Sequence, residues 1–140
     1  MSINVMECRD ARTTVFFNLE LRRRVTEVIT EKVMYLLSLR YEDGVRWKGS
    51  KADLLELIHE VYVHGDIKMP DRCHANLTYL VRTCFANLGL MVMKNVHSHV
   101  RRAAKRKGIR SGRLVEHIRE MVACNMDLDK QLWNELIDRP

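Results

Sequence analysis

The chain has 140 residues, of which 46% are apolar and 30% charged, values typical of one globular domain. Six glycines and two prolines are too few for a sandwich or barrel with many tight turns. The sequence has neither a membrane-length apolar run nor the apolar core of a signal peptide at its start. We therefore expect a single cytoplasmic domain over residues 1–140, with its four cysteines reduced.

The basic residues are concentrated in one part of the sequence. Between Arg72 and Val115 there are ten Lys or Arg and no Asp or Glu, so the rest of the chain is slightly acidic. Within this part, the stretch from Arg101 to Arg113 has seven basic residues in thirteen. Segregated charge of this kind predicts a negatively charged partner and says little about the fold.

The first predicted element is one long helix over residues 12–40. Its apolar residues recur every three or four positions with charged residues between them, which is typical of an amphipathic helix. The letters YEDG at 41–44 end it, and VRW at 45–47 indicates a short strand. Such a helix can bury its apolar stripe against a second copy, so the sequence suggests a homodimer. The stripe consists of Val25, Val28, Ile29, Leu36 and Leu37.

The second helix has the clearest start signal in the chain. Ser50 is placed as the N-cap, and Asp53 follows three residues later, the spacing of a capping box in which each side chain reaches the other's backbone N–H. Gly65 can take the left-handed conformation that ends a helix. The predicted apolar face is formed by Leu54, Leu57, Ile58 and Val61.

A third helix is predicted over about residues 72–88, opened by Pro70 and Asp71. The letters DIKM before it, at 66–69, allow a small strand. The residues Asn87–Leu90, with a glycine among them, form a tight interruption after this helix. Its apolar positions are Leu77, Leu80, Val81 and Phe85.

A fourth helix is predicted over about residues 91–107 and ends at Gly108. It is amphipathic, with an apolar stripe on one face and a basic face opposite. The stripe contains Met93, Val96, Val100 and Ala103. The basic face contains Lys94, His97, Arg101 and Lys105, flanked by Ser98 and Arg102.

Two further helices complete the predicted fold. One covers about residues 112–125, with Leu114, Ile118 and Met121 packed, and a short C-terminal helix carries Leu132, Trp133 and Leu136. The sequence therefore predicts an all-α or mainly α domain. Its helix-turn-helix or winged-helix-like core spans about residues 45–126, and two or three short strands could form the wing.

The two helices around the Gly89 turn match a helix-turn-helix, in which the second helix enters the major groove of DNA. One face of such a helix must pack on the core while the other offers cations and hydrogen-bond donors to the groove. The sequence thus predicts a duplex-DNA-binding regulator. The expected contacts to DNA are made by Lys94, His97, Ser98, Arg101, Arg102 and Lys105, with Arg106, Lys107, Arg110 and Arg113 more suited to phosphates.

The basic face also allows two alternatives to DNA binding. It could simply be solvated, although solvated helix faces usually mix charge signs, or it could dock an acidic protein partner. A disordered basic arm is disfavoured by the apolar stripe. Binding to a membrane surface is disfavoured because the stripe lacks large apolar anchors.

Chemistry other than binding has little support in the sequence. Cys73, His74, Cys84, His97 and His99 have the spacing of no zinc finger or ribbon. We find no Gly-rich phosphate loop and no nucleophile elbow. We therefore expect no catalytic residue, no metal, no cofactor and no small-molecule substrate.

Two stretches of the chain resemble a known family. The first runs from Arg46 to Ile67 and has the pattern Trp-x-Gly-Ser-Lys-x-Asp-Leu-x-Glu-Leu-Ile, carried here by Trp47, Gly49, Ser50, Lys51, Asp53, Leu54, Glu56, Leu57 and Ile58. The second has the form Arg-Lys-x-x-Arg-Ser/Thr followed by Leu-Asp/Glu, and is carried by Arg106, Lys107, Arg110, Ser111, Leu114, Val115 and Glu116. Both resemble the C-terminal part of the RteC family, and the resemblance covers about residues 40–125.

The RteC family regulates excision of tetracycline-resistance conjugative transposons in Bacteroides and relatives. The resemblance implies a winged-helix-like domain that binds promoter DNA and activates excision genes. Family members are generally longer, and residues 68–99 match only loosely. Ser50, Asp53 and Leu54 have the character of cap and core residues, so the first motif is interpreted as structural.

Overall fold

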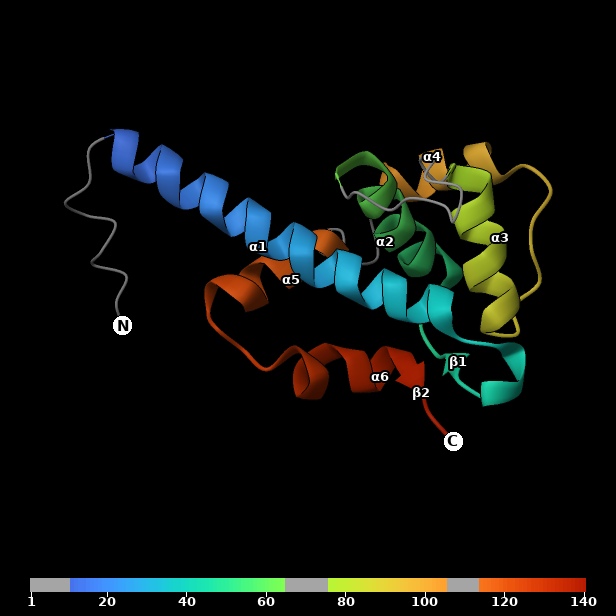
Figure 1. Cartoon of the computed structure of the whole chain (residues 1–140). Helices are drawn as coiled ribbons and strands as arrows, with labels where there is room; N and C mark the ends of the chain where they lie inside the picture. The colour runs from blue at the N-terminus through green and yellow to red at the C-terminus, as the bar shows by residue number, and fades with distance from the viewer. Residues whose placement is uncertain (1–10, 65–75, 106–113) are drawn as a thin grey trace.

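The computed structural model describes residues 11–64, 76–105 and 114–140, and these fold mainly into helices. Figure 1 shows the helices packed around one long helix, α1. This part of the chain bears out the predicted mainly α fold. The helices are α1 (Ala11–Ser38), η2 (Tyr41–Asp43), α2 (Lys51–His64), α3 (Leu77–Asn87), α4 (Val96–Ala104), α5 (Leu114–Ala123), η3 (Asp129–Trp133) and α6 (Asn134–Leu136); the strands are β1 (Arg46–Trp47) and β2 (Ile137–Asp138).

Helix α1 packs against α2, α3 and α5 along its second half. Its polar contacts include the side-chain amide of Asn87, which donates to the carbonyls of Leu36 (3.0 Å) and Leu37 (3.2 Å) at the end of the helix. The first turns of α1 extend beyond the other helices (Figure 1). Among the side chains of α1 that the structure describes, the buried apolar ones are Leu21, Val25, Ile29, Val33 and Leu36.

This packing corrects one expectation. The stripe that a second copy was expected to cover is largely buried inside the chain itself, because α2, α3 and α5 lie against it. Among the large apolar side chains described on α1, Leu19 (56%) and Met34 (53%) stay exposed. A contact between two copies through α1 must therefore use another surface than the predicted stripe.

Helix α2 is the most deeply buried helix of the described core. The backbone N–H of Asp53 donates to Ser50 Oγ (3.1 Å), which confirms Ser50 as the N-terminal cap. Its predicted apolar face is confirmed, since Leu54, Leu57 and Ile58 have no exposed surface. The predicted end at Gly65 lies outside the described residues.

Strand β1 confirms the short strand expected at VRW. It pairs antiparallel with β2, with Arg46 opposite Asp138 and Trp47 opposite Ile137. The sequence did not indicate this partner, which is the C-terminal end of the chain. In Figure 1 the strand pair and α4 lie at opposite edges of the molecule, so this sheet does not flank the basic helix as a wing would. The strand expected at 66–69 lies outside the described residues.

The remaining helices agree with expectation only in part. Helix α3 begins at Leu77 and not near 72, because the Asn76 side chain accepts a hydrogen bond from Tyr79 N–H (2.7 Å) and caps the helix. Helix α5 falls within the predicted 112–125. The C-terminal helix is a five-residue π-helix, η3, followed by the three-residue α6. In the described part of the chain, we find no helix with the length and apolar character needed to cross a membrane.

Candidate nucleic-acid interface

Helix α4 is held to the core by one narrow face. Val96 (3%), Val100 (2%) and Ala103 (4%) are buried and recur at i, i+4 and i+7, so they lie on one side of the helix. They pack against α2 and α3. The predicted division of α4 into an apolar and a polar face is therefore confirmed for its helical residues.

The predicted extent of this helix, 91–107, is wrong. It begins at Val96, after Asn95 in the N-cap position, and ends at Ala104, with Lys105 as C-cap. The residues before it run without helical structure, and Val92 and Met93 are partly buried against the core from there. The Asn95 side chain makes no capping hydrogen bond, so the packing of Val92 and Met93 against the core is the observed feature that accompanies the later start. The connection between α3 and α4 is consequently longer than the predicted turn.

The polar face of α4 is exposed to solvent. His97, Ser98, Arg101 and Arg102 are exposed on the helix, and Lys105 is exposed at its end. Lys94 is also exposed, but on the segment before the helix. The structure thus brings six of the predicted DNA-binding residues to the surface around one helix. The other four, Arg106, Lys107, Arg110 and Arg113, lie outside the described residues.

The charges of this surface have one sign. From Asn76 to Lys105 the sequence has five Arg or Lys and no acid. Within the described ranges, none of these five side chains makes an ion pair or a side-chain hydrogen bond. The five are Arg82, Lys94, Arg101, Arg102 and Lys105.

Helix α1 shows the opposite pattern. Arg23 forms ion pairs with Glu20 and Glu27 one turn away on either side. The hydrogen bond from Arg23 lowers the pKa of Glu20, and the same contacts raise the pKa of Arg23. The exposed face of α1 thus has ion pairs between residues of the same helix. Among the described residues, α4 has no such pair.

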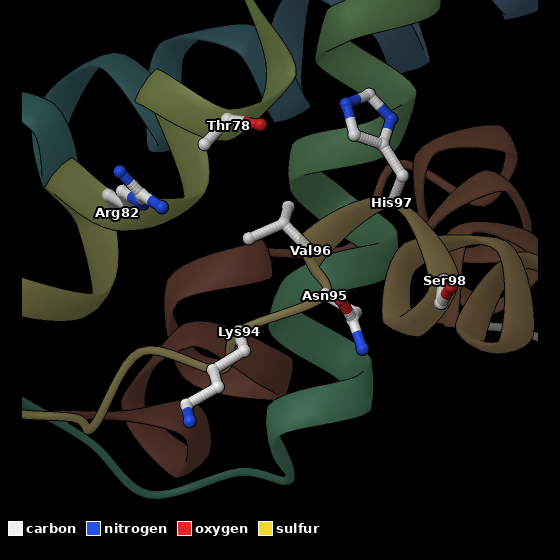
Figure 2. A pocket seen from close by; sticks show the side chains of 7 residues that line it. All are labelled: Thr78, Arg82, Lys94, Asn95, Val96, His97 and Ser98. Carbon is white, nitrogen blue, oxygen red and sulfur yellow. The ribbon is translucent and has the colours of Figure 1, made fainter.

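Two residues of α3 that sequence reasoning did not single out lie beside this surface. Thr78 and Arg82 line a cavity of about 240 Å³ together with residues 94–98 (Figure 2). Arg82 belongs to the acid-free part of the sequence, and this charge distribution is the sequence feature that could have identified it. Its place opposite the start of α4 depends on how the two helices pack and is not visible in the sequence.

Cysteine and histidine side chains also occur outside α4, in the described core and on its surface. Cys84 is fully buried, and its burial raises the pKa of the thiol to about 12, so it is a core residue. No group of three or more potential metal ligands occurs among the described residues, which do not include Cys73 and His74. His64 is exposed and lies 3.7 Å from Glu60 one turn before it.

The sequence motif that resembles the RteC family contributes to the core. Ser50 caps α2, and Trp47 Nε1 donates to the carbonyl of Ser50 (2.8 Å). Glu56 is 2% exposed, and its Oε2 accepts the backbone N–H of Val115 (2.7 Å) at the start of α5. These contacts support the interpretation of this motif as structural.

Comparisons with protein-family models, with curated proteins and with solved structures found no match for this chain. The resemblance to the RteC family therefore depends on the two sequence motifs alone.

Proposed function

We propose that this protein is a DNA-binding transcriptional regulator of a mobile genetic element and that α4 reads duplex DNA. The observation that carries the proposal is the two-faced character of α4. Val100 and its apolar neighbours hold the helix on the core, while Arg101 and Arg102 are exposed on the other face, within a part of the sequence (76–105) that has no Asp or Glu. The major groove of B-DNA is about 12 Å wide and admits one α-helix presented in this way.

Helices α3 and α4 would form the helix-turn-helix-like part of the domain. They pack against each other, and both contact α2. Their connection, residues 88–95, is longer than the three- or four-residue turn of most such motifs. A winged-helix form would also need strands beside α4, and the β1–β2 pair lies elsewhere (Figure 1).

The residue types fit different parts of DNA. Arginine can bind guanine or a phosphate with two hydrogen bonds, which suits Arg101 and Arg102 on the exposed helix face. Lysine acts as a point charge, which suits Lys94 and Lys105 at the two ends of the helix. For Arg106, Lys107, Arg110 and Arg113 we keep the sequence-based proposal of phosphate contacts.

The assignment to a mobile element comes only from the resemblance to the RteC family. We also propose a homodimer through the N-terminal part of α1, because the first turns of this helix extend beyond the other helices and Leu19 is exposed (Figure 1). A symmetric dimer would place two copies of α4 for two half-sites, spaced about one DNA turn apart.

An electrophoretic mobility shift tests the central proposal. The purified protein is mixed with duplexes from its own gene neighbourhood at about 150 mM salt, with a scrambled duplex as competitor. We expect a shift that survives the competitor. A shift erased by any duplex, or no shift, would contradict site-specific reading and would favour an acidic protein as the partner of the same face.

The salt dependence of binding tests the contacts to phosphate. If about five phosphates are neutralised, the logarithm of the association constant falls against the logarithm of salt concentration with a slope near −4.5. That slope corresponds to a loss of roughly 500-fold between 50 and 200 mM salt. A slope near zero would contradict phosphate contacts altogether.

A further inference from the structure

The cavity between α3 and α4 differs from the rest of the proposed interface because it is concave and lined from two helices. Thr78 and Arg82 come from α3, and residues 94–98 come from the segment that leads into α4 and from its first turn. Figure 2 shows the two groups on opposite sides, with the Val96 side chain directed toward α3. Val96 is 3% exposed and is the apolar residue among those that line the cavity.

The lining of this cavity is suited to a compact anion. It contains the cations Arg82 and Lys94, the imidazole of His97 and the hydroxyls of Thr78 and Ser98. No carboxylate is among the lining residues, and in the described part of the chain these five side chains have no hydrogen-bond partner or ion pair. Guanidinium, ammonium and hydroxyl groups are the donors that proteins use for phosphate oxygens.

The size of the cavity restricts which anion can enter. A volume of about 240 Å³ accommodates a phosphate group with water, but it is below the usual 300–1,000 Å³ of pockets for drug-sized molecules. The cavity is open and lies beside the exposed face of α4. A phosphate that belongs to a long polyanion could therefore enter while the rest of the polymer continues along α4.

We propose that this cavity seats one phosphodiester group of the DNA backbone, with Arg82 as its main charged contact. This proposal rests on the proposed function and adds α3 to the interface. A fixed phosphate contact from α3 sets the register of α4 in the groove, which is the role that backbone contacts have in most protein–DNA complexes. His97 and Ser98 line the cavity, and α4 continues from them to Arg101 and Arg102, which are proposed to enter the groove.

Two arginine variants test the proposal by fluorescence anisotropy with a labelled duplex from 50 to 200 mM salt. Arg82→Gln removes the charge in the cavity but keeps a polar side chain. Arg119→Gln is the matched control, because Arg119 is an exposed arginine on α5 that lines a different cavity, with Glu60 and His64. Melting temperatures verify that both variants are folded.

We expect Arg82→Gln to reduce the magnitude of the salt slope by about 0.9 and to weaken binding equally for specific and scrambled duplexes. Arg82→Lys should restore the slope, because it restores the charge. Arg119→Gln should leave the slope unchanged. If the unchanged protein binds DNA and Arg82→Gln has the same slope, the cavity proposal is wrong and the proposed function stands.

A second measurement separates the cavity from DNA binding. Inorganic phosphate is titrated into ¹⁵N-labelled protein, and the backbone amide signals of Val96, His97 and Ser98 are followed. We expect saturable shifts in the unchanged protein and none in Arg82→Gln. Saturable shifts without any duplex binding would reject a DNA phosphate and would show a site for phosphate groups from another source. Amides that do not shift would reject the site itself.

Discussion

The Glu56 carboxylate accepts a hydrogen bond from the backbone N–H of Val115 at 2.7 Å, and both residues are buried. The contact joins α2 to the first turn of α5, which directly follows the basic stretch ending at Arg113. A carboxylate at a helix start satisfies a backbone donor that has no partner within the helix. Glu56 therefore connects α2 to α5, the helix that follows the basic stretch.

Replacing Glu56 should destabilise the fold. Glu56→Ala leaves a buried backbone N–H without this acceptor, at a cost of about 2–3 kcal/mol in the free energy of unfolding. Glu56→Gln keeps an oxygen acceptor and should cost less. Urea unfolding at pH 7 measures both.

Glu60→Gln, on the same helix, removes only a contact with exposed His64 and should change stability by less than about 1 kcal/mol. Equal stabilities of the three variants would contradict this role of Glu56.

Gly49 is expected to tolerate no larger side chain without rearrangement. A Cβ atom there would lie 2.6 Å from Leu136 Cδ2 and 3.2 Å from Trp47 Nε1, and this indole is held by its hydrogen bond to Ser50. Gly49→Ala should therefore cost about 1–2 kcal/mol in the free energy of unfolding.

Leu136→Ala provides the second variant for this test. It removes the closest of the clashing atoms, so the double variant should be more stable than the sum of the single changes predicts, by at least about 0.5 kcal/mol. Urea unfolding of the four proteins gives this coupling. If the free-energy changes of the two single variants add up to that of the double variant, then Leu136 does not clash with a side chain at position 49.

The exposed arginines of α4 should affect binding and not stability. Arg101→Ala combined with Arg102→Ala should weaken DNA binding by about 2–4 kcal/mol, since each arginine can form a bidentate pair of hydrogen bonds with guanine or a phosphate. The melting temperature should change little, because both side chains are exposed. Val100→Ala is the opposite control, with an expected loss of about 2 kcal/mol of stability and unchanged binding by the folded fraction. Unfolding of the double variant would show that the assigned helix face is wrong.

The buried thiol of Cys84 should resist alkylation in the native protein. With its pKa raised to about 12, only about one molecule in ten thousand carries the thiolate at pH 8. Cys124 is exposed, so iodoacetamide should modify it first. Peptide mapping by mass spectrometry after a short reaction at pH 8 distinguishes the two. Labelling of Cys84 at the rate of Cys124 would contradict its burial.

The same pKa shift predicts a loss of stability in alkali. The folded pKa of Cys84 lies above its ordinary value of 9.0, so folding favours the neutral thiol. This contribution is complete below about pH 9 and is lost as the pH rises toward 12. Cys84→Ala should therefore show a flatter loss of stability between pH 9 and pH 11 than the unchanged protein.

The proposed homodimer predicts a difference between two exposed residues of α1. Leu19→Glu places a charge in the first third of the helix and should shift sedimentation from dimer to monomer. Met34→Glu, similarly exposed but near the end of the helix, should leave the dimer intact. A monomer in the unchanged protein, or the same effect of both variants, would contradict an interface through the N-terminal part of α1.

The spacing of apolar residues was sufficient to predict the helical fold and the faces of its helices. The 3.6-residue period alone predicts Val96, Val100 and Ala103 in the core and Arg101 and Arg102 on the surface, and the structure confirms both. The period follows from backbone geometry within one helix, so it needs no knowledge of the partners of that helix. The Ser50 cap was predictable for the same reason, since its hydrogen bond to Asp53 N–H spans three residues.

The helix limits required more than the period. The predicted start of α4 is five residues too early because Met93 continues the apolar pattern of the helix. Met93 indeed packs against the core, but from a segment without helical backbone. An apolar residue at a helix end satisfies the pattern in both conformations, and only the packing of Leu90 and Val92 beside it distinguishes them.

Contacts between distant parts of the chain were decided by the tertiary structure. The hydrogen bond of Glu56 to Val115, the pairing of β1 with β2 and the cavity shared by Arg82 and Lys94 each join different elements. Their partners have no fixed spacing in the sequence, because they depend on how the helices pack around α1. The sequence alone thus determined which side of α4 carries its positive charge. The packing of α3 against α4 decided which further groups lie beside that charge.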